Sequence, residues 1–426
     1  MKSASGAGAP RRDGADAPRA NEPRVCLTMI VKDEAHVMQR CLESVALVVD
    51  SYLIADTGST DGTPEKIVEV AAKLGIPGRV LHHAWKDYGA NRTMVFDVLR
   101  AEPERADYAL MIDADDVLEV RDVEAFRASL RAGRGALDVH VGWASDRDGA
   151  IWHRPQVFRM DLPWRYERSY HELATCDVPF DRDFAKGVAY WCHRDGGRQA
   201  DPEKLAKEIA LLQGQLEERP GDPRATYYLH QLYYENLDEP GFRALAEEWG
   251  RRVIEGEGWH EERFMAALRL GDLLEREGSF DVAQGMFLRA MGLSWGRVEP
   301  YARLARMHRL RAAYGWANVA YVLAKVGSQV RLDPRALLAE RATAAYAIWE
   351  ELTIAAYAST RYADAVAAAE RVLASGAPDD YRRRALENLR LARSRMKQEP
   401  LAGVATVPAN RFQRRAIDAK KRKEKR

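Results

Sequence analysis

Carboxylates follow two hydrophobic runs in the first third of the chain. Asp56 comes after the apolar residues of LIADTGSTDGT, and three further aspartates follow the run in YALMIDADDVL, at Asp113, Asp115 and Asp116. Short apolar runs bounded by turn residues are typical of buried parallel strands. In an open α/β sheet, ligands bind beyond the carboxyl ends of such strands. We therefore expect these four carboxylates to face one crevice.

Asp113 and Asp115 are two residues apart beyond a strand, so both are expected to approach one metal ion. Carboxylate oxygens suit Mg²⁺ or Mn²⁺, and such an ion neutralises a diphosphate leaving group well. Asp115 is the predicted direct ligand, whereas Asp113 is expected to act as a ligand, through a water or, if the bound molecule is a nucleotide, through its ribose. The alternative is an acidic helix N-terminus. Three acids in four residues directly after Met-Ile favour the metal site.

The surrounding pattern predicts the elements that hold these acids. Helices alternate with strands, and the Thr63-Pro64 pair marks one helix start, with Thr63 as its cap. Alternation of this kind indicates a mostly parallel sheet covered by helices on both faces. Residues 138–195 are expected to add mixed strands and loops that complete the site. The predicted strands span 25–31, 52–55, 79–82 and 108–112; the predicted helices span 34–49 and 63–74, and a third begins near Ala90.

The chain turns helical after Asp201-Pro202 and stays so to about residue 396. Small and large residues recur there at the spacing of a tetratricopeptide repeat, a unit of two antiparallel helices. This predicts a stack of helix pairs, with an irregular helical bundle as the alternative. The first match comprises Leu270, Gly271, Leu274, Gly278, Phe280, Ala283, Phe287 and Ala290, the second Trp349, Ala356, Tyr362, Ala365 and Ala369, with weaker copies around 227–234 and 301–323.

Composition limits the class of protein. The 46% hydrophobic content suits globular cores, and the net charge of +1 gives no overall attraction to nucleic acid or membrane. Four cysteines without a CxxC pair, no signal-like N-terminus and no run of eighteen apolar residues predict a soluble, cytoplasmic protein without a membrane span. The predicted organisation is a disordered tail (1–23), an α/β domain (24–200), a helical-repeat domain (201–398) and a disordered basic tail (399–426).

Four segments in order, TMIVKDE, IADTGSTDGT, WKDYGANR and MIDADD, resemble a family-2 glycosyltransferase with the Rossmann-like GT-A fold. The resemblance covers about residues 24–198. It is closest to a bacterial branch with DTGSTDGT, DADE and HE motifs, in which helical repeats often follow the catalytic domain. It implies metal-dependent, inverting transfer of a sugar from a nucleotide diphospho-sugar, with a UDP-hexose as the expected donor.

The resemblance also implies roles for individual residues. Asp56 accepts hydrogen bonds from the nucleoside, and Arg92 either contacts the diphosphate or forms a surface salt bridge. Asp33 stands where the branch has Asn, Asp116 stands where it has Glu, and Asp61 is expected to be a turn or capping group. The residues implied to contact the nucleotide sugar are Thr28, Ile30, Lys32, Glu34, Asp56, Arg92, Asp113 and Ala114.

Tyr170-His171-Glu172 matches the HE pair of the branch. Since an inverting transferase needs a base near the acceptor hydroxyl, Glu172 is the candidate base and His171 a neighbour of metal or phosphate. His193 either completes the metal shell with Asp113 and Asp115 or is a packed side chain. The rival bases are Asp146 and Asp148, and Arg154 and Arg159 support either donor phosphates or the fold.

The helical half is expected to present a concave surface to a polymeric acceptor, which is a peptide or protein, a glycan or a nucleic acid. The basic C-terminus, KKRKEKR, adds weight to an anionic polymer such as nucleic acid. In a second interpretation, the sugar-transfer domain is a relic and the repeats form an interaction scaffold. A third, nucleotidyl transfer, requires a glycine-rich phosphate loop near the first strand, which LTMIVKDE does not contain.

Overall fold

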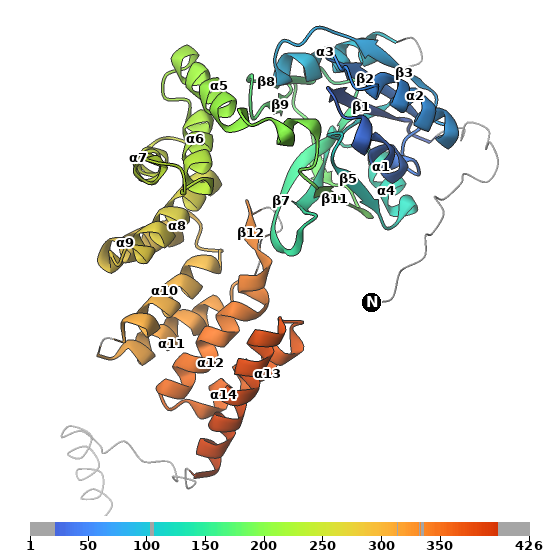
Figure 1. The fold of residues 1–426 in the computed structure, drawn as a ribbon. Coiled ribbons are helices and arrows are strands. Elements are labelled where there is room, and N and C mark those ends of the chain that lie inside the picture. The colour runs from blue at the N-terminus through green and yellow to red at the C-terminus, as the bar shows by residue number, and fades with distance from the viewer. Residues whose placement is uncertain (1–21, 103–105, 313, 332, 334–335, 399–426) are drawn as a thin grey trace, which may run out of the picture.

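The computed structural model describes residues 22–102, 106–312, 314–331, 333 and 336–398, without the side chains of 146–151, 198 and 200. An α/β domain is followed by a curved array of helices (Figure 1). This agrees with the predicted fold class. The expected basic tail and nearly all of the expected N-terminal tail lie outside the described residues.

The central sheet has the strand order β3-β2-β1-β4-β7-β6-β11-β5. The first four of these strands are mutually parallel, whereas β7 is antiparallel to both β4 and β6. A separate pair, β8 and β9, is antiparallel. The strands are β1 Val25–Val31, β2 Ser51–Asp56, β3 Gly78–His82, β4 Tyr108–Met111, β5 Val117–Val120, β6 Ala136–Trp143, β7 Asp146–Arg159, β8 Arg165–Glu167, β9 Leu173–Thr175, β10 Arg182–Phe184 beside β6, and β11 Val188–Cys192.

Strand β1 lies between the two strands that carry the acidic motifs. Val31 is paired with Asp56 of β2, and Thr28 is paired with Met111 of β4. Both neighbours run parallel to β1, so their carboxyl ends reach the same edge of the sheet. The predicted meeting of the two motifs at one edge is therefore confirmed.

Successive residues of a strand point to opposite faces of its sheet, and helices cover both faces. Leu27 and Met29 of β1 pack with α1 Ala35–Val45, α2 Thr63–Leu74 and α4 Val123–Arg131. Cys26 packs on the other face, with α3 Tyr88–Ala101. Of these four helices, α3 alone therefore covers this second face of the sheet.

The second half consists largely of antiparallel helix pairs. Gly271 illustrates their small-against-large contact, because a Cβ there would lie 2.5 Å from the Phe287 ring. The predicted tetratricopeptide-like repeats are therefore present. The helices are α5 Lys204–Glu218, then the pairs α6 Pro223–Glu235 with α7 Phe242–Glu255, α8 His260–Arg276 with α9 Phe280–Leu293, α10 Glu299–Arg311 with α11 Trp316–Gly327, and α12 Ile348–Ala358 with α13 Tyr362–Ala374, and finally α14 Asp379–Gln398.

The helical half also touches the α/β domain through a strand of its own. The two-residue strand β12, Ala339–Glu340, pairs antiparallel with β7 at Ile151 and Ala150, and Figure 1 shows it reaching toward β7. A second contact is the ion pair between Arg168, after β8, and Asp222, the N-cap of α6, with a nitrogen–oxygen distance of 2.9 Å. In the part of the chain that the structure describes, no helix is both long and apolar enough to cross a membrane.

We predict that Gly271→Ala destabilises the helical half by about 1–3 kcal/mol, because the added methyl group overpacks against Phe287. Gly285 is the matched control, since it lies within α9 with open space around it. Gly285→Ala should stabilise the protein by about 0.5–1 kcal/mol through helix propensity. Urea midpoints followed by circular dichroism measure both effects, and equal shifts for the two variants would contradict the packing argument.

Candidate active site

Arg92 joins two acidic residues from different parts of the domain. From α3 it forms ion pairs with Asp113 (Nη2 to Oδ1, 2.6 Å) and Glu172 (Nε to Oε1, 2.7 Å). Burial opposes charge on this guanidinium, but the two carboxylates outweigh it and raise the pKa of Arg92 above its ordinary value. Arg92 is thus a buried bridge between the acidic cluster and the candidate base, rather than part of a surface salt bridge.

Arg154 of β7 and Tyr190 of β11 support the acidic cluster from strands that lie beyond β4, on the side away from β1. The Tyr190 hydroxyl accepts a hydrogen bond from the Asp113 N–H at 3.1 Å. Arg154 lies over the Tyr190 ring, 4.8 Å from its centroid, and its Nη2 lies 3.5 Å from Asp113 and 3.8 Å from Asp116. Tyr190 was not predicted, because an aromatic residue within an apolar run gives no signal of a polar role.

Glu34 and Asp115 converge from neighbouring strand ends against Gly196. A Cβ at Gly196 would lie 2.9 Å from both Glu34 carboxylate oxygens and 3.1 Å from the Asp115 carboxyl carbon. The Gly196 N–H donates to Asp115 at 3.3 Å, whereas the buried Oε2 of Glu34 has no hydrogen-bond partner. Both carboxylates therefore border Gly196, and that of Glu34 has acceptor capacity left over.

The crowding of carboxylates raises several pKa values. Burial, followed by the charge of Asp113, raises the pKa of Asp116 to about 7 and also raises that of Asp115. Burial is the main cause that raises the pKa of Glu34 to about 7, and the charge of Asp115 adds to it. Each of these groups would be easier to ionise beside a cation.

Asp56 is buried at the end of β2 and shapes the following turn. Its carboxylate accepts hydrogen bonds from the N–H groups of Gly58 and Ser59 at 3.2–3.3 Å, and His82 Nδ1 lies 3.5 Å from it. Its side chain is only 5% exposed. Binding of a nucleoside by Asp56 stays a prediction.

The remaining polar groups of the loop after Asp56 hold the segment that follows β1. Ser59 Oγ accepts from the Asp33 N–H, Thr63 Oγ1 from the Glu34 N–H, and Asp61 from the Ala35 N–H, at 2.8–2.9 Å. The structural role expected of Asp61 is confirmed. The capping role expected of Thr63 was wrong, because its hydroxyl serves the start of α1, and α2 begins after Gly62 in the left-handed region (φ 85°).

Thr28 does not reach the site. It lies in the middle of β1, is fully buried, and donates its hydroxyl proton to the Leu110 carbonyl oxygen at 3.2 Å. The expected contact between Thr28 and a nucleotide is therefore corrected. Of the other expected nucleotide contacts, Ile30 is half-buried, Lys32 is exposed and Ala114 is buried beside Asp113.

The two histidines occupy different positions. The His171 ring stacks on Tyr228 of α6, with centroids 3.5 Å apart, which gives it a packing role at the contact with the helical half. The His193 N–H donates to Asp116 at 3.3 Å, so this residue borders the acidic cluster. Catalysis by His171 and metal binding by His193 stay predictions.

The other candidates fall elsewhere. Arg159 bonds to Asp161 and to the Gly133 carbonyl oxygen, in keeping with support of the fold. Asp146 and Asp148 belong to β7, and their side chains are outside the described residues.

The acidic cluster offers few protein ligands to a divalent cation. Within the described residues, no group of three or more His, Cys, Asp or Glu side chains is arranged to hold a metal ion. Mg²⁺ at phosphate-binding sites commonly takes only one or two protein carboxylates, with substrate phosphates and water as its other ligands. Asp115 and the unpartnered oxygen of Glu34 fit that simpler arrangement.

An open, mostly parallel sheet with carboxylates at the carboxyl ends of its strands defines an α/β domain of the GT-A kind. Residues 26–185 match the family model described as Glycosyl transferase family 2, so this part of the chain is a family 2 glycosyltransferase domain. Repeats of the tetratricopeptide kind follow it.

A TPR repeat-containing protein of Synechococcus elongatus is 28% identical over 293 residues, which cover 67% of this chain and 60% of that protein. Among solved structures, the C-terminal part of a TPR repeat-containing protein from Cytophaga hutchinsonii is 15% identical (TM-score 0.33; 47% of this chain and 70% of that chain). A thermophilic TPR protein of Thermus thermophilus is 18% identical (TM-score 0.30; 44% and 91%).

We predict that Asp116→Asn stabilises the metal-free protein relative to wild type, and that this gain is larger at pH 8 than at pH 5. The folded protein holds the Asp116 proton up to about pH 7, whereas the unfolded chain releases it near 3.8, so wild-type stability falls as the pH rises between these values. The gain at pH 8 should reach at most a few kcal/mol, since one pKa unit corresponds to about 1.36 kcal/mol.

Thermal unfolding in a chelator at both pH values measures this difference. The exposed Asp183 provides the control, because Asp183→Asn should change stability equally at pH 5 and pH 8. An Asp116→Asn effect that does not depend on pH would contradict the expected titration.

Proposed function

We propose that the protein is a metal-dependent, inverting glycosyltransferase that takes a nucleotide diphospho-sugar, of the UDP-hexose kind, as its donor. The observation that carries the proposal is the convergence of Glu34 and Asp115, from neighbouring strand ends, within a family 2 domain. Arg92 links the candidate base Glu172 to the same cluster through its ion pair with Asp113.

In this proposal, Asp56 binds the nucleoside at the end of β2, and Lys32 lies on the exposed side of the same edge. Asp113, Asp115 and the adjacent Glu34 would hold Mn²⁺ or Mg²⁺, with His193 bordering the cluster. When bound, the cation supplies positive charge to the departing diphosphate.

Glu172 acts as the base. It takes the proton of the acceptor hydroxyl, whose oxygen forms a bond to the anomeric carbon as the bond from that carbon to the diphosphate breaks on the opposite face. One displacement of this kind inverts the anomeric centre. The ion pair with Arg92 fixes the position of the Glu172 carboxylate, and position is the first requirement for a general base.

The helical half would hold a polymeric acceptor. Cysteine usage favours a cytoplasmic location.

A second candidate function is an interaction scaffold with an inactive sugar-transfer domain. The name of the Synechococcus relative, a TPR repeat-containing protein, favours this alternative. Binding and turnover of a donor distinguish the two.

We predict that a nucleotide-sugar panel with Mn²⁺ gives a thermal shift and slow donor hydrolysis, and that a chelator abolishes both. Asp115→Asn should remove the Mn²⁺-dependent shift, because a metal ligand is lost. Glu172→Gln should retain the shift but slow transfer or hydrolysis about 100-fold or more, because the proton acceptor is lost. Asp183→Asn is the control. A wild-type protein that binds no donor at any Mn²⁺ concentration would favour the scaffold.

A further inference from the structure

Positive charge is concentrated at the C-terminal end of the chain. Residues 379–426 hold 16 of the 65 Lys and Arg residues but only 6 of the 64 Asp and Glu residues. Their net charge is therefore +10, whereas residues 1–378 carry a net charge of −9. The part of this region that the structure describes is α14, the last helix of the array (Figure 1). A chain that is nearly neutral as a whole thus has one strongly basic end.

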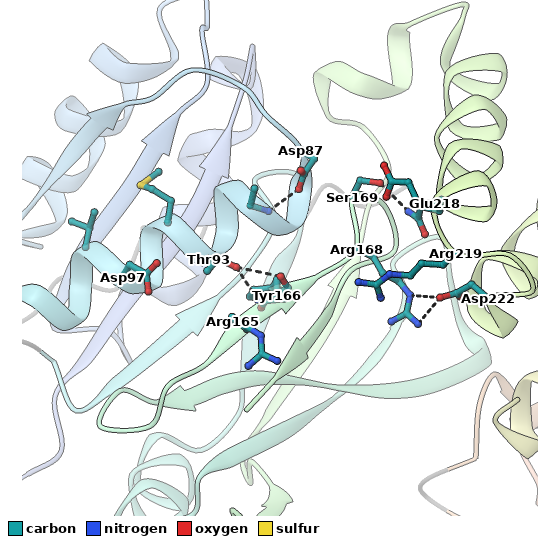
Figure 2. Close-up of a pocket in the computed structure, with 14 residues that line it drawn as sticks. Asp87, Thr93, Asp97, Arg165, Tyr166, Arg168, Ser169, Glu218, Arg219 and Asp222 are labelled. Carbon is teal, nitrogen blue, oxygen red and sulfur yellow. Dashed lines mark hydrogen bonds and ion pairs between the residues drawn. The ribbon is translucent and has the colours of Figure 1, made fainter. Parts of the chain in front are cut away.

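Cations that lie at contacts within the protein are paired with carboxylates. Figure 2 shows this at the junction of the two halves, where Arg168 forms an ion pair with Asp222. On α14, Arg393 pairs with Glu370 of α13 at 2.7 Å, and Arg384 pairs with a carboxylate of α12. These charges stabilise the packing of the helices and are not available to a partner.

Three other cations of α14 are not paired in this way. Arg383, Arg390 and Lys397 are exposed, and none of their side chains forms an ion pair or hydrogen bond with another residue that the structure describes. They are seven positions apart, so they lie on one side of the helix, with about 10.5 Å between neighbours along its axis. Glu387 lies between the two arginines in sequence but forms no ion pair with either in the described part of the chain. We call Arg383, Arg390 and Lys397 the basic stripe.

The apolar side of α14 is not available to a membrane. An amphipathic helix binds a lipid surface by inserting its apolar face. On α14 that face consists of Ala385, Leu389 and Ala392, which are buried. Ala392, for example, packs with Ala356 of α12 and Ala365 of α13. The helix has therefore already used its apolar face within the protein.

The exposed apolar side chains of α14 do not form a second apolar face. Leu386, Leu391 and Met396 are 44–46% exposed. They are five positions apart, and each therefore points about 140° around the helix from the one before. The outer surface of α14 thus offers a partner charge rather than apolar area.

Nucleic acid has the charge density that suits this surface. Duplex DNA carries one negative charge per about 1.7 Å of its axis, so cations about 10.5 Å apart each meet a phosphate in any register. Guanidinium groups also bind phosphate oxygens in pairs, which favours arginine at such contacts. In the sequence beyond α14, residues 399–426 add nine Lys and Arg residues against three acids, so the positive charge continues past the helix.

We propose that the basic stripe of α14 binds the phosphate backbone of nucleic acid, without reading its sequence. Contacts to phosphates fix the position of a protein on a nucleic acid but carry no sequence information. The proposal goes beyond sugar transfer and does not depend on it, because the stripe belongs to the last helix of the array and the candidate active site to the α/β domain.

The test measures binding of the full-length protein to a fluorescein-labelled 20-nucleotide RNA and a 20-base-pair DNA duplex by anisotropy, at several NaCl concentrations. Wild type should bind both with dissociation constants of about 1–100 µM near physiological salt. The triple variant Arg383→Gln, Arg390→Gln and Lys397→Gln should weaken binding more than about tenfold at low salt. It should also lower the slope of log affinity against log salt by about 2–3, because three phosphate contacts are lost.

A second triple variant with the same change of charge is the control. Arg276→Gln, Arg289→Gln and Arg331→Gln replace exposed cations elsewhere in the helical half and should leave the slope unchanged. Both triple variants should keep the wild-type melting temperature, because all six side chains are exposed. If the stripe variant melts early, the single variant Arg390→Gln decides, and its slope should fall by about 0.7–0.9.

Unchanged binding in the stripe variants would overturn the proposal, as would an equal loss in the control variant, which would indicate overall charge instead of a surface. Displacement of the RNA by phosphatidylserine vesicles would assign the stripe to a membrane. Salt-sensitive self-association that the stripe variant abolishes, seen by sedimentation without nucleic acid, would assign it to a second copy of the chain. Either result overturns the proposal. Mn²⁺-dependent donor hydrolysis should be equal in both triple variants, and its absence from wild type would remove only the proposed sugar transfer.

Discussion

The excess of buried negative charge at the strand ends is the constraint on which the site depends. Each carboxylate there loses hydration on folding, and each repels its neighbours. Arg92 and Arg154 offset part of this cost, and the remainder appears in the raised pKa values of Glu34, Asp115 and Asp116. An arrangement that is strained when empty of positive charge favours a cation or a cation-bearing substrate. The raised pKa values and the proposed cation binding therefore have the same cause, which is the crowding of carboxylates at the strand ends.

The helical half takes part in building the site as well as extending the chain. The segment that ends in Glu172 is fixed by three contacts with helices α5 and α6: Gln215 with the Tyr170 carbonyl oxygen, Tyr228 with the His171 ring, and Asp222 with Arg168. Glu172 comes directly after these residues in the chain, and its carboxylate forms an ion pair with Arg92 of α3. The position of the candidate base therefore depends on the repeats, and removing them would release it even if the sheet folded alone.

Local patterns in the sequence predicted the parallel strands, the helix that stops at Gly75 and the repeat around Gly271, because hydrophobic period and turn residues act over short distances. They did not predict Tyr190 or β12, whose roles arise from pairings between distant strands. Thr28 was misplaced for a related reason. The run VCLTMIV predicts the strand but not how far each residue lies from the strand end. Thr28 lies in the middle of β1 and is fully buried.

A buried ionic network explains how so short a strand as β12 can hold the two halves together. Arg297 is buried between Glu261 and Glu299, an arrangement whose loss of hydration can exceed its Coulombic gain. These carboxylates also accept the N–H groups of Leu337, at 2.9 Å, and Glu340, at 3.2 Å. The ion pairs therefore fix the backbone that leads into β12, and β12 in turn fixes the repeats against β7. With the ion pair between Arg168 and Asp222 as the second attachment, the helical half is fixed to the α/β domain at two separate points.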